Sequence, residues 1–162
     1  MKIRVFLIAL VCAGGCLHAA VGEERLRDEV NLAPLAWAQI ECAVYSNYAE
    51  QPSVREPSNI LADAGINNLI AFLEAFKAGR ISQEDIGSKV PTGIALNLQD
   101  SWVSADFLAG RLYQTIFTDA SDSVWKYGPG DGDRFGEYRP QELRPLVAEN
   151  LYFTNNCHLL VP

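Results

Sequence analysis

The chain has 162 residues, which suits one domain with one core, and it carries a formal net charge of −7 at pH 7. Binding to phosphates needs clustered Lys and Arg, so this charge argues against a nucleic-acid partner and against a polybasic contact with a membrane surface. The acidity is typical of a soluble protein surface, and an acidic face that meets a basic partner is the alternative interpretation.

The N-terminal residues have the pattern of a secretory signal peptide. Two basic residues precede an apolar run over residues 5–13, and small residues follow as far as Ala20. The apolar run is too short to span a bilayer as a stable helix, which needs roughly 20 apolar residues. We therefore expect residues 1–20 to be a signal peptide and residues 21–162 to form a single helical domain, periplasmic or secreted, with no transmembrane segment.

The cleavage point has two interpretations. Cleavage after Ala19 or Ala20 gives a soluble protein. The alternative is residues 13–16, Ala-Gly-Gly-Cys, which resemble a bacterial lipobox with Ala where Leu is usual, so that Cys16 would carry a lipid anchor. In either case the basic residues at positions 2 and 4 are lost, which leaves eleven of the thirteen Lys and Arg against twenty Asp and Glu. The mature protein is therefore clearly acidic.

Two cysteines, Cys42 and Cys157, remain in the soluble mature form. An even pair in an oxidising compartment usually forms a disulfide. A bond that closes a loop of about 100 residues stabilises a fold by roughly 4–5 kcal/mol in the chain-entropy description. Two buried free thiols are the alternative. A metal site is not expected, because two isolated cysteines and one mature histidine lack the spacing of a ligand set.

Residues 32–51 are predicted to form the first long helix, because their apolar side chains fall on two adjacent stripes with three- and four-residue spacing. The first stripe holds Leu35, Ala38, Cys42, Tyr45 and Ala49, and the second holds Trp37, Ile40, Val44 and Tyr48. So broad an apolar face indicates a central helix. Pro52 and Pro57 bracket the exit from this helix, because proline disfavours helix both at and just before itself.

A second helix is predicted over residues 58–78, with a row of large apolar side chains and Gly79 as its C-terminal cap. Asn67 and Asn68 interrupt the apolar face, and a buried Asn in such a place usually hydrogen-bonds to a neighbouring helix. Next along the chain, Ser82 occupies the N-cap position of a short helical turn.

The strongest periodic signal predicts one long helix over residues 92–126. Its apolar residues are spaced alternately by four and three positions, as in a packed helix seam. These residues are Leu98, Trp102, Ala105, Ala109, Leu112 and Ile116. The pattern weakens from Asp119 to Ser123, where a break is expected before the helix resumes.

The last predicted helix covers residues 145–155, with Pro145 in its first turn and Cys157 just past its end. No stretch alternates apolar and polar residues with the β-branched content of a strand. The sequence therefore predicts an all-α fold, a compact bundle of four main helices plus a short helical turn, closed by one disulfide.

The loop over residues 131–142 partly matches the calcium-binding EF-hand pattern. It agrees at the first, third, sixth and twelfth positions, which include Gly136 and Glu142. The fifth position holds Phe135, which cannot ligate an ion. Glycines before the loop and Pro145 after it interrupt the two helices that should flank it. We therefore predict that this loop binds no calcium and that the chain has no metal site.

Acid–base catalysis would need two positioned carboxylates, or a histidine with a partner. The candidate carboxylates are Glu41 on the first helix and Asp100 and Asp106 on the long one. Glu41 is embedded in a mostly apolar helix, so partial shielding is expected. An exposed helix face, or an ion pair with Arg111, is the plainer interpretation, and no catalytic residue is assigned.

Nucleophilic catalysis and cofactor binding have little support. His158 is the one mature histidine and lies in the C-terminal tail, which is typical of a surface residue. The chain has no Gly-x-Ser-x-Gly elbow and no glycine motif that would cradle a phosphate or dinucleotide, so no cofactor is expected. The tryptophans have the helical spacing of core residues. A ligand pocket lined by Trp102, Tyr113 and Tyr45 is the alternative.

Two classes of function stay open from the sequence. The first is a non-enzymatic binding protein of the cell envelope, such as an inhibitor, an immunity-type protein or an accessory subunit, whose partner is another protein. The second is a carboxylate-dependent hydrolase acting on a cell-wall or sugar polymer, which needs two carboxyl groups about 5–10 Å apart in a cleft.

Overall fold

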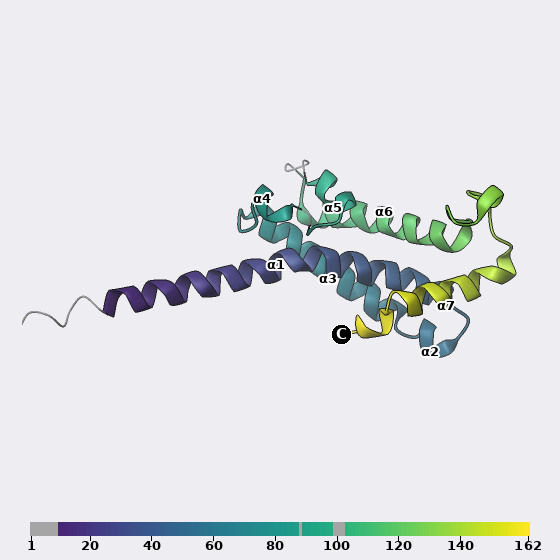
Figure 1. The fold of residues 1–162 in the computed structure, drawn as a ribbon, viewed down its shortest axis with the longest axis horizontal. Helices are drawn as coiled ribbons and strands as arrows, with labels where there is room; N and C mark the ends of the chain where they lie inside the picture. The colour runs from purple at the N-terminus through teal and green to yellow at the C-terminus, as the bar shows by residue number, and fades with distance from the viewer. Residues whose placement is uncertain (1–9, 88, 99–102) are drawn as a thin grey trace, which may run out of the picture.

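The computed structural model describes residues 10–87, 89–98 and 103–162, and over these residues the chain is an all-α bundle (Figure 1). The four long helices are α1 (Leu10–Tyr48), α3 (Ser58–Lys77), α6 (Ala105–Trp125) and α7 (Arg144–Thr154). The short ones are α2 (Pro52–Arg55), α4 (Gln83–Ile86), α5 (Thr92–Asn97) and the 3-10 helices η1 (Gly132–Arg134), η2 (Gln141–Leu143) and η3 (Cys157–Leu159). The predicted fold class is confirmed.

Helix α1 is central, and α3, α6 and α7 all contact it. Helix α3 runs antiparallel to α1, because Asn68 donates a hydrogen bond to Gln39 at 2.8 Å while Ser58 donates to the Ala43 carbonyl at 3.0 Å. The expected role of Asn68 as a link between helices is therefore confirmed. Gly65 lies between these two bonds, where a Cβ atom would come within 2.6 Å of Ile40. The glycine thus lets the two helices approach closely.

The core consists of two clusters of buried side chains, both of which draw on α1. The larger cluster includes Val30, Ala33, Ala36, Ile40, Leu69, Phe72, Leu73, Ile94, Leu108, Leu112 and Ile116. The second cluster includes Cys42, Val44, Tyr45, Val54, Leu61, Ala120, Val124, Ala148, Tyr152 and Cys157. The predicted stripes of the first helix therefore supply both clusters, although Leu35 at one end is exposed.

Local signals explain both ends of the segment between α3 and α4. Gly79 has a φ of 70°, the left-handed conformation that ends many helices. The Gly79 amide bonds to the Phe76 carbonyl and the Arg80 amide to the Ala75 carbonyl, both at 3.0 Å. At the start of α4, the Ser82 hydroxyl accepts from the Asp85 amide, and the Asp85 carboxylate accepts from the Ser82 amide. Both predicted caps are confirmed.

The single helix predicted over residues 92–126 is wrong. Helix α5 ends at Asn97 and α6 begins at Ala105. The Ser104 hydroxyl accepts a hydrogen bond from the Phe107 amide at 3.2 Å, so this serine is an N-cap that starts a new helix. Trp102 of the predicted seam lies outside the described residues.

The break expected between Asp119 and Ser123 does not occur, since α6 continues to Trp125. The Ser123 hydroxyl donates to the Asp119 carbonyl at 3.0 Å, one turn back within the helix. Ala120, within this stretch, and Val124, just after it, are buried in the core. Burial of the apolar face therefore holds the helix together where the polar residues suggested a break.

Helix α1 begins at Leu10, far ahead of the predicted start at residue 32, and its N-terminal part projects beyond the bundle (Figure 1). Its end at Tyr48 lies close to the predicted one. Residues 1–9 lie outside the described residues, and the division into a signal peptide and a mature domain at residue 20 stays a prediction. Among the residues that the structure describes, no helix is both long enough and apolar enough to cross a membrane.

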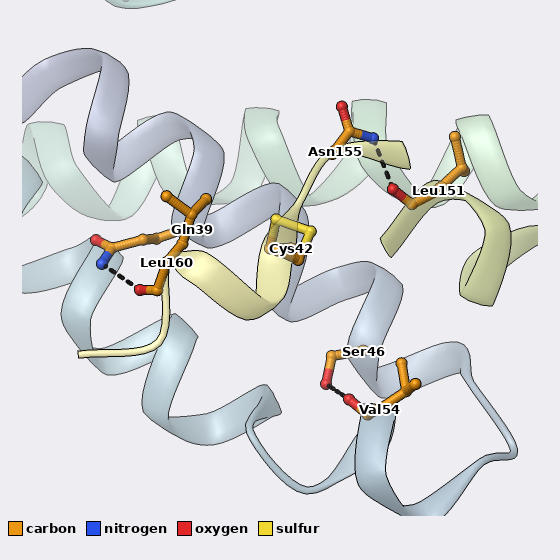
Figure 2. The surroundings of a disulfide bond; sticks show 8 residues. Gln39, Cys42, Ser46, Val54, Leu151, Asn155 and Leu160 are labelled. Atoms are coloured by element: carbon orange, nitrogen blue, oxygen red, sulfur yellow. Dashed lines mark hydrogen bonds between the residues drawn. A yellow bond between two sulfur atoms is a disulfide. The ribbon is translucent and has the colours of Figure 1, made fainter. Parts of the chain in front are cut away.

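Cys42 of α1 and Cys157 of η3 form a disulfide, with their Cα atoms 5.4 Å apart (Figure 2). Both residues are buried. Beside the bond, the Gln39 side chain donates to the Leu160 carbonyl at 3.1 Å, which fixes the tail after the disulfide against α1. The cross-link therefore attaches the C-terminal end of the bundle to its central helix.

Candidate functional site

A polar seam runs along the face of α1 that meets α5 and α6. Trp37, Glu41 and Tyr45 follow one another at four-residue intervals, so they share one face of the helix. The ring of Trp37 packs against Gly93 of α5, where an added Cβ would lie 2.8 Å from the ring. The same ring hydrogen-bonds Glu41. The seam therefore begins with a tryptophan that is fixed in position and holds a carboxylate.

The surroundings of Glu41 favour its protonated form. Desolvation in the helix interface raises the pKa of Glu41 above its ordinary value, and the negative charge of Asp119 on α6 raises it further. The hydrogen bond from Trp37 stabilises the charged carboxylate and offsets part of this effect. A carboxyl group in this setting can hold and release a proton closer to neutral pH than an exposed glutamate can.

Tyr45 continues the seam from inside the core. Burial and the charge of Glu41 raise the pKa of Tyr45 to about 12, and a hydrogen bond with Ser123 lowers it in part. The phenol therefore stays protonated at any physiological pH, and its 5% exposure leaves little of it accessible. Its role in this position is to pack and to hydrogen-bond rather than to exchange a proton with solvent.

A shallow depression lies where the end of α6 meets the following loop. Its lining residues are Asp122, Ser123, Lys126, Tyr127, Gly128, Phe135 and Gly136. Lys126 and Asp122 form an ion pair across 2.8 Å within it. Ser123 belongs to both the depression and the seam, whereas Glu41 and Asp119 do not line the depression. The shielded carboxyl and this hollow are therefore neighbouring features and not one site.

The loop after α6 is organised around the ring of Tyr127. The guanidinium of Arg134 lies 3.7 Å from the ring centre and that of Arg139 lies 5.1 Å from it. Such contacts between cations and aromatic rings stabilise by roughly 0.5–1 kcal/mol at exposed sites. Arg139 also donates to the carbonyls of Ser123 at 2.7 Å and Val124 at 3.2 Å, which caps the C-terminal end of α6. Sequence reasoning missed this cluster, because no spacing rule joins its members.

The acidic residue that opens the EF-hand-like stretch makes bonds within the loop itself. The Asp131 carboxylate accepts from the Gly128 amide at 2.6 Å and from Arg139 at 3.3 Å. Phe135 projects into solvent, and Gly136 has a φ of 82°. Within residues 10–87, 89–98 and 103–162, no group of three or more His, Cys, Asp or Glu residues is placed to hold a metal. Whether the loop binds calcium stays a prediction for titration.

The other residues proposed from the sequence are scattered. Asp100 lies outside the described residues, as Trp102 does, so the pocket proposed from Trp102, Tyr113 and Tyr45 is not described as a whole. Asp106 is exposed in the first turn of α6, where its charge suits the helix dipole. Arg111 hydrogen-bonds to Asn97 of α5.

His158 is exposed in η3, as a surface residue would be. This histidine follows Cys157 directly and lies at the C-terminal end of the bundle, whereas the polar seam lies between α1 and α6. The structure therefore gives His158 no place beside Glu41.

An apolar row that starts at the end of η2 and follows the outer face of α7 was also missed. Leu143, Leu146 and Phe153 are exposed by 41%, 58% and 51%. Positions 143, 146, 150 and 153 are spaced by three, four and three residues, so they form one helical stripe that has Asn150 at its third place. On the opposite face of α7, Ala148 and Tyr152 are buried. A helix that only packs against the bundle needs apolar residues on one face, whereas α7 has them on both faces.

No family model matches the chain, and no curated protein and no solved structure matches it either. The seam, the depression, the arginine-aromatic loop and the outer stripe of α7 are therefore the features from which a function has to be argued.

Proposed function

We propose that this chain is an exported, non-enzymatic interaction protein of the cell envelope, of the inhibitor, immunity or accessory-subunit kind. The observation that carries the proposal is the outer stripe of α7, formed by Leu143, Leu146 and Phe153. Three large apolar side chains in one helical row, each about half exposed, are typical of a surface that another protein covers.

The charge and the cross-link support the proposed compartment and partner. A net charge of −7 favours a protein partner over nucleic acid. The Cys42–Cys157 disulfide suits an oxidising compartment, periplasmic or extracellular, to which the signal-like residues 1–20 would direct the chain. A lipid anchor at Cys16 is the alternative form of the same proposal, and it leaves the surface of α7 unchanged.

The test is capture of a partner followed by reconstitution. Mature protein with its disulfide intact is used as bait in an extract of its native envelope, and the recovered protein is then purified separately and titrated against the bait. We expect a saturable complex of fixed stoichiometry. Failure of every recovered protein to bind the purified bait would contradict the proposal.

A second candidate function is hydrolysis by a carboxyl group, and one observation favours it. Glu41 has a raised pKa beside the charge of Asp119, which is the electrostatic arrangement of a general acid next to a carboxylate. The test is turnover of purified cell-wall glycan by the wild type and by the Glu41→Gln variant. Activity that Glu41→Gln abolishes, and that the exposed-site variant Glu74→Gln retains, would favour the enzyme over the binder.

A further inference from the structure

We propose that the outer stripe of α7 docks a cationic amphipathic helix of a partner protein. This inference rests on the proposed interaction function and adds to it the place of contact and the chemistry of the partner. Three properties of α7 carry the inference: its fixed position on the bundle, its helical row of apolar side chains, and the charges that surround this row.

Helix α7 is attached to the bundle on its inner side at three levels. Near its middle, the Glu149 carboxylate accepts from the backbone amides of Glu50 and Gln51 at 3.2 and 2.8 Å. Tyr152 is buried against α1 with 3% exposure. Just past its end, Cys157 is bonded to α1. The outer stripe is therefore presented in one fixed orientation, so that binding of a partner costs little conformational entropy in this surface.

The shape of the stripe suits another helix. Within α7 the row from Leu146 to Phe153 extends over about 10 Å at the rise of an α-helix, and Leu143, the last residue of η2, lies one turn before it. The alternating three- and four-residue spacing is that of a seam between two helices, into which side chains of the partner helix would insert. Asn150 within the row supplies a polar group that can fix the register of the partner.

The charges around the stripe favour a partner that is positively charged. Between residues 141 and 162 the one Lys or Arg is Arg144, and the acid exposed beside the stripe is Glu142. The other acid, Glu149, uses its carboxylate on the inner side, where it accepts from the amides of Glu50 and Gln51. The guanidinium of Arg144 is turned inward, where it donates to the Arg139 carbonyl at 3.1 Å and lies 5.8 Å from the ring of Trp125. An apolar row with an exposed acid beside it, in a protein of net charge −7, is complementary to a helix that carries Lys or Arg beside its apolar face.

The same charges disfavour two other occupants. A second copy of this chain would bring an identical acidic surface against the first, and like charges across an interface oppose binding. An anionic lipid surface is attracted by clustered Lys and Arg, which residues 141–162 lack. A cationic helix is the occupant that the charge pattern favours.

The experiment uses full mature protein with its disulfide intact and a synthetic helix of about 18 residues, or five turns, with leucine on one face and lysine on the other. Binding is measured by fluorescence anisotropy at physiological ionic strength. The test variant, Leu146→Gln with Phe153→Gln, removes the stripe without changing charge. The matched control, Leu96→Gln with Phe107→Gln, removes a Leu and a Phe that are 66% and 57% exposed on α5 and α6.

We expect the stripe variant to bind the peptide about tenfold or more weakly than the wild type, and the control variant to bind like the wild type. We also expect a matching peptide with glutamate in place of lysine to bind about tenfold or more weakly. Circular dichroism of both variants verifies that they are folded.

The docking proposal would be overturned if both variants lost the same peptide affinity, or if neither variant lost any. It would also be overturned if the acidic peptide bound as tightly as the lysine peptide. A wild-type dimer that Leu146→Gln with Phe153→Gln dissociates would overturn it as well, in favour of a second copy. A reconstituted envelope partner that binds the stripe variant with unchanged affinity would overturn this inference while the interaction function stands.

Discussion

Glu41 shows how one residue can matter for both stability and chemistry. It is shielded between α1 and α6, accepts a hydrogen bond from Trp37 and faces the charge of Asp119. The sequence indicated the shielding, because the residues around it are apolar. It could not indicate Asp119, because this residue lies far along the chain and reaches Glu41 only when α6 packs against α1.

The raised pKa of Glu41 predicts a pH dependence of stability. When a carboxyl has a higher pKa folded than unfolded, its protonated form favours folding at pH values below the unfolded pKa. That contribution is lost as the pH rises through the folded pKa. We therefore expect Glu41→Gln to raise the melting temperature at pH 7 and to have a smaller effect near pH 4.

Thermal unfolding followed by circular dichroism at several pH values measures this difference. Glu74→Gln, on an exposed position of α3, is the matched control and should show no such pH dependence. A Glu41→Gln variant that is less stable than the wild type at pH 7 would show that the charged form is favoured after all.

At the scale of elements, helices whose signals are local were predicted well. Helix α3 was placed correctly because its apolar row, Gly79 and its end all lie within a few residues of one another. The predicted helix over residues 92–126 failed because the apolar period from Leu98 to Ile116 continues through the break, which the structure marks with the N-cap Ser104. The arginine-aromatic loop was beyond prediction, since Arg134 and Arg139 contact Tyr127 through a loop path that no periodicity encodes.

The close packing of α1 on α3 predicts the effect of adding one methyl group. A Cβ at Gly65 would lie 2.6 Å from Ile40 Cγ1 and 3.1 Å from the Ala36 carbonyl oxygen, so the two helix backbones would have to separate. We expect Gly65→Ala to lower the free energy of unfolding by about 1–3 kcal/mol. Urea denaturation is the measurement.

Gly110→Ala is the natural control for that substitution. Gly110 is an exposed position within α6, and no atom lies within 4 Å of where its Cβ would be. Alanine there should raise the free energy of unfolding by about 0.5–1 kcal/mol, because it favours the helix more than glycine does. If both variants were stabilised, the contact between α1 and α3 would be looser than described here.

The loop after α6 carries a prediction of its own. Arg139 donates to the last carbonyls of α6 and also bonds to Asp131, so truncation removes the cap of a 21-residue helix. We expect Arg139→Ala to lower the free energy of unfolding by about 1–2 kcal/mol. Arg55→Ala, at an exposed position of α2, should change it by less than about 0.5 kcal/mol. Comparable effects from both substitutions would mean that removal of a positive charge, and not removal of the helix cap, accounts for the loss of stability.

For the whole molecule, the disulfide is the feature that the sequence predicted best. Counting cysteines left one pair, and the described structure joins Cys42 to Cys157 across a sequence separation of 115 residues. The outer stripe of α7 was not predicted, because a helix that is apolar on two faces looks like a core helix until its neighbours are known. Which of its faces the bundle covers is a property of the whole fold.

Removal of the cross-link should weaken the fold markedly. In the chain-entropy description, a loop of this size contributes on the order of 4–5 kcal/mol, so Cys42→Ser with Cys157→Ser should lose roughly that amount in urea denaturation. Hydrogen exchange should accelerate first at residues 157–162, where Gln39 bonds to the Leu160 carbonyl. Unchanged exchange in this tail would show that packing alone keeps it in place.

The position of the disulfide also determines the outcome of proteolysis. The exposed stretch over residues 129–138 lies inside the covalent loop that Cys42 and Cys157 close. A single cut there would yield two polypeptides that remain one molecule, with α7 still bonded to α1. The nicked protein would separate on a gel only after reduction, and the stripe on α7 would stay in place while the loop beside it was free to open.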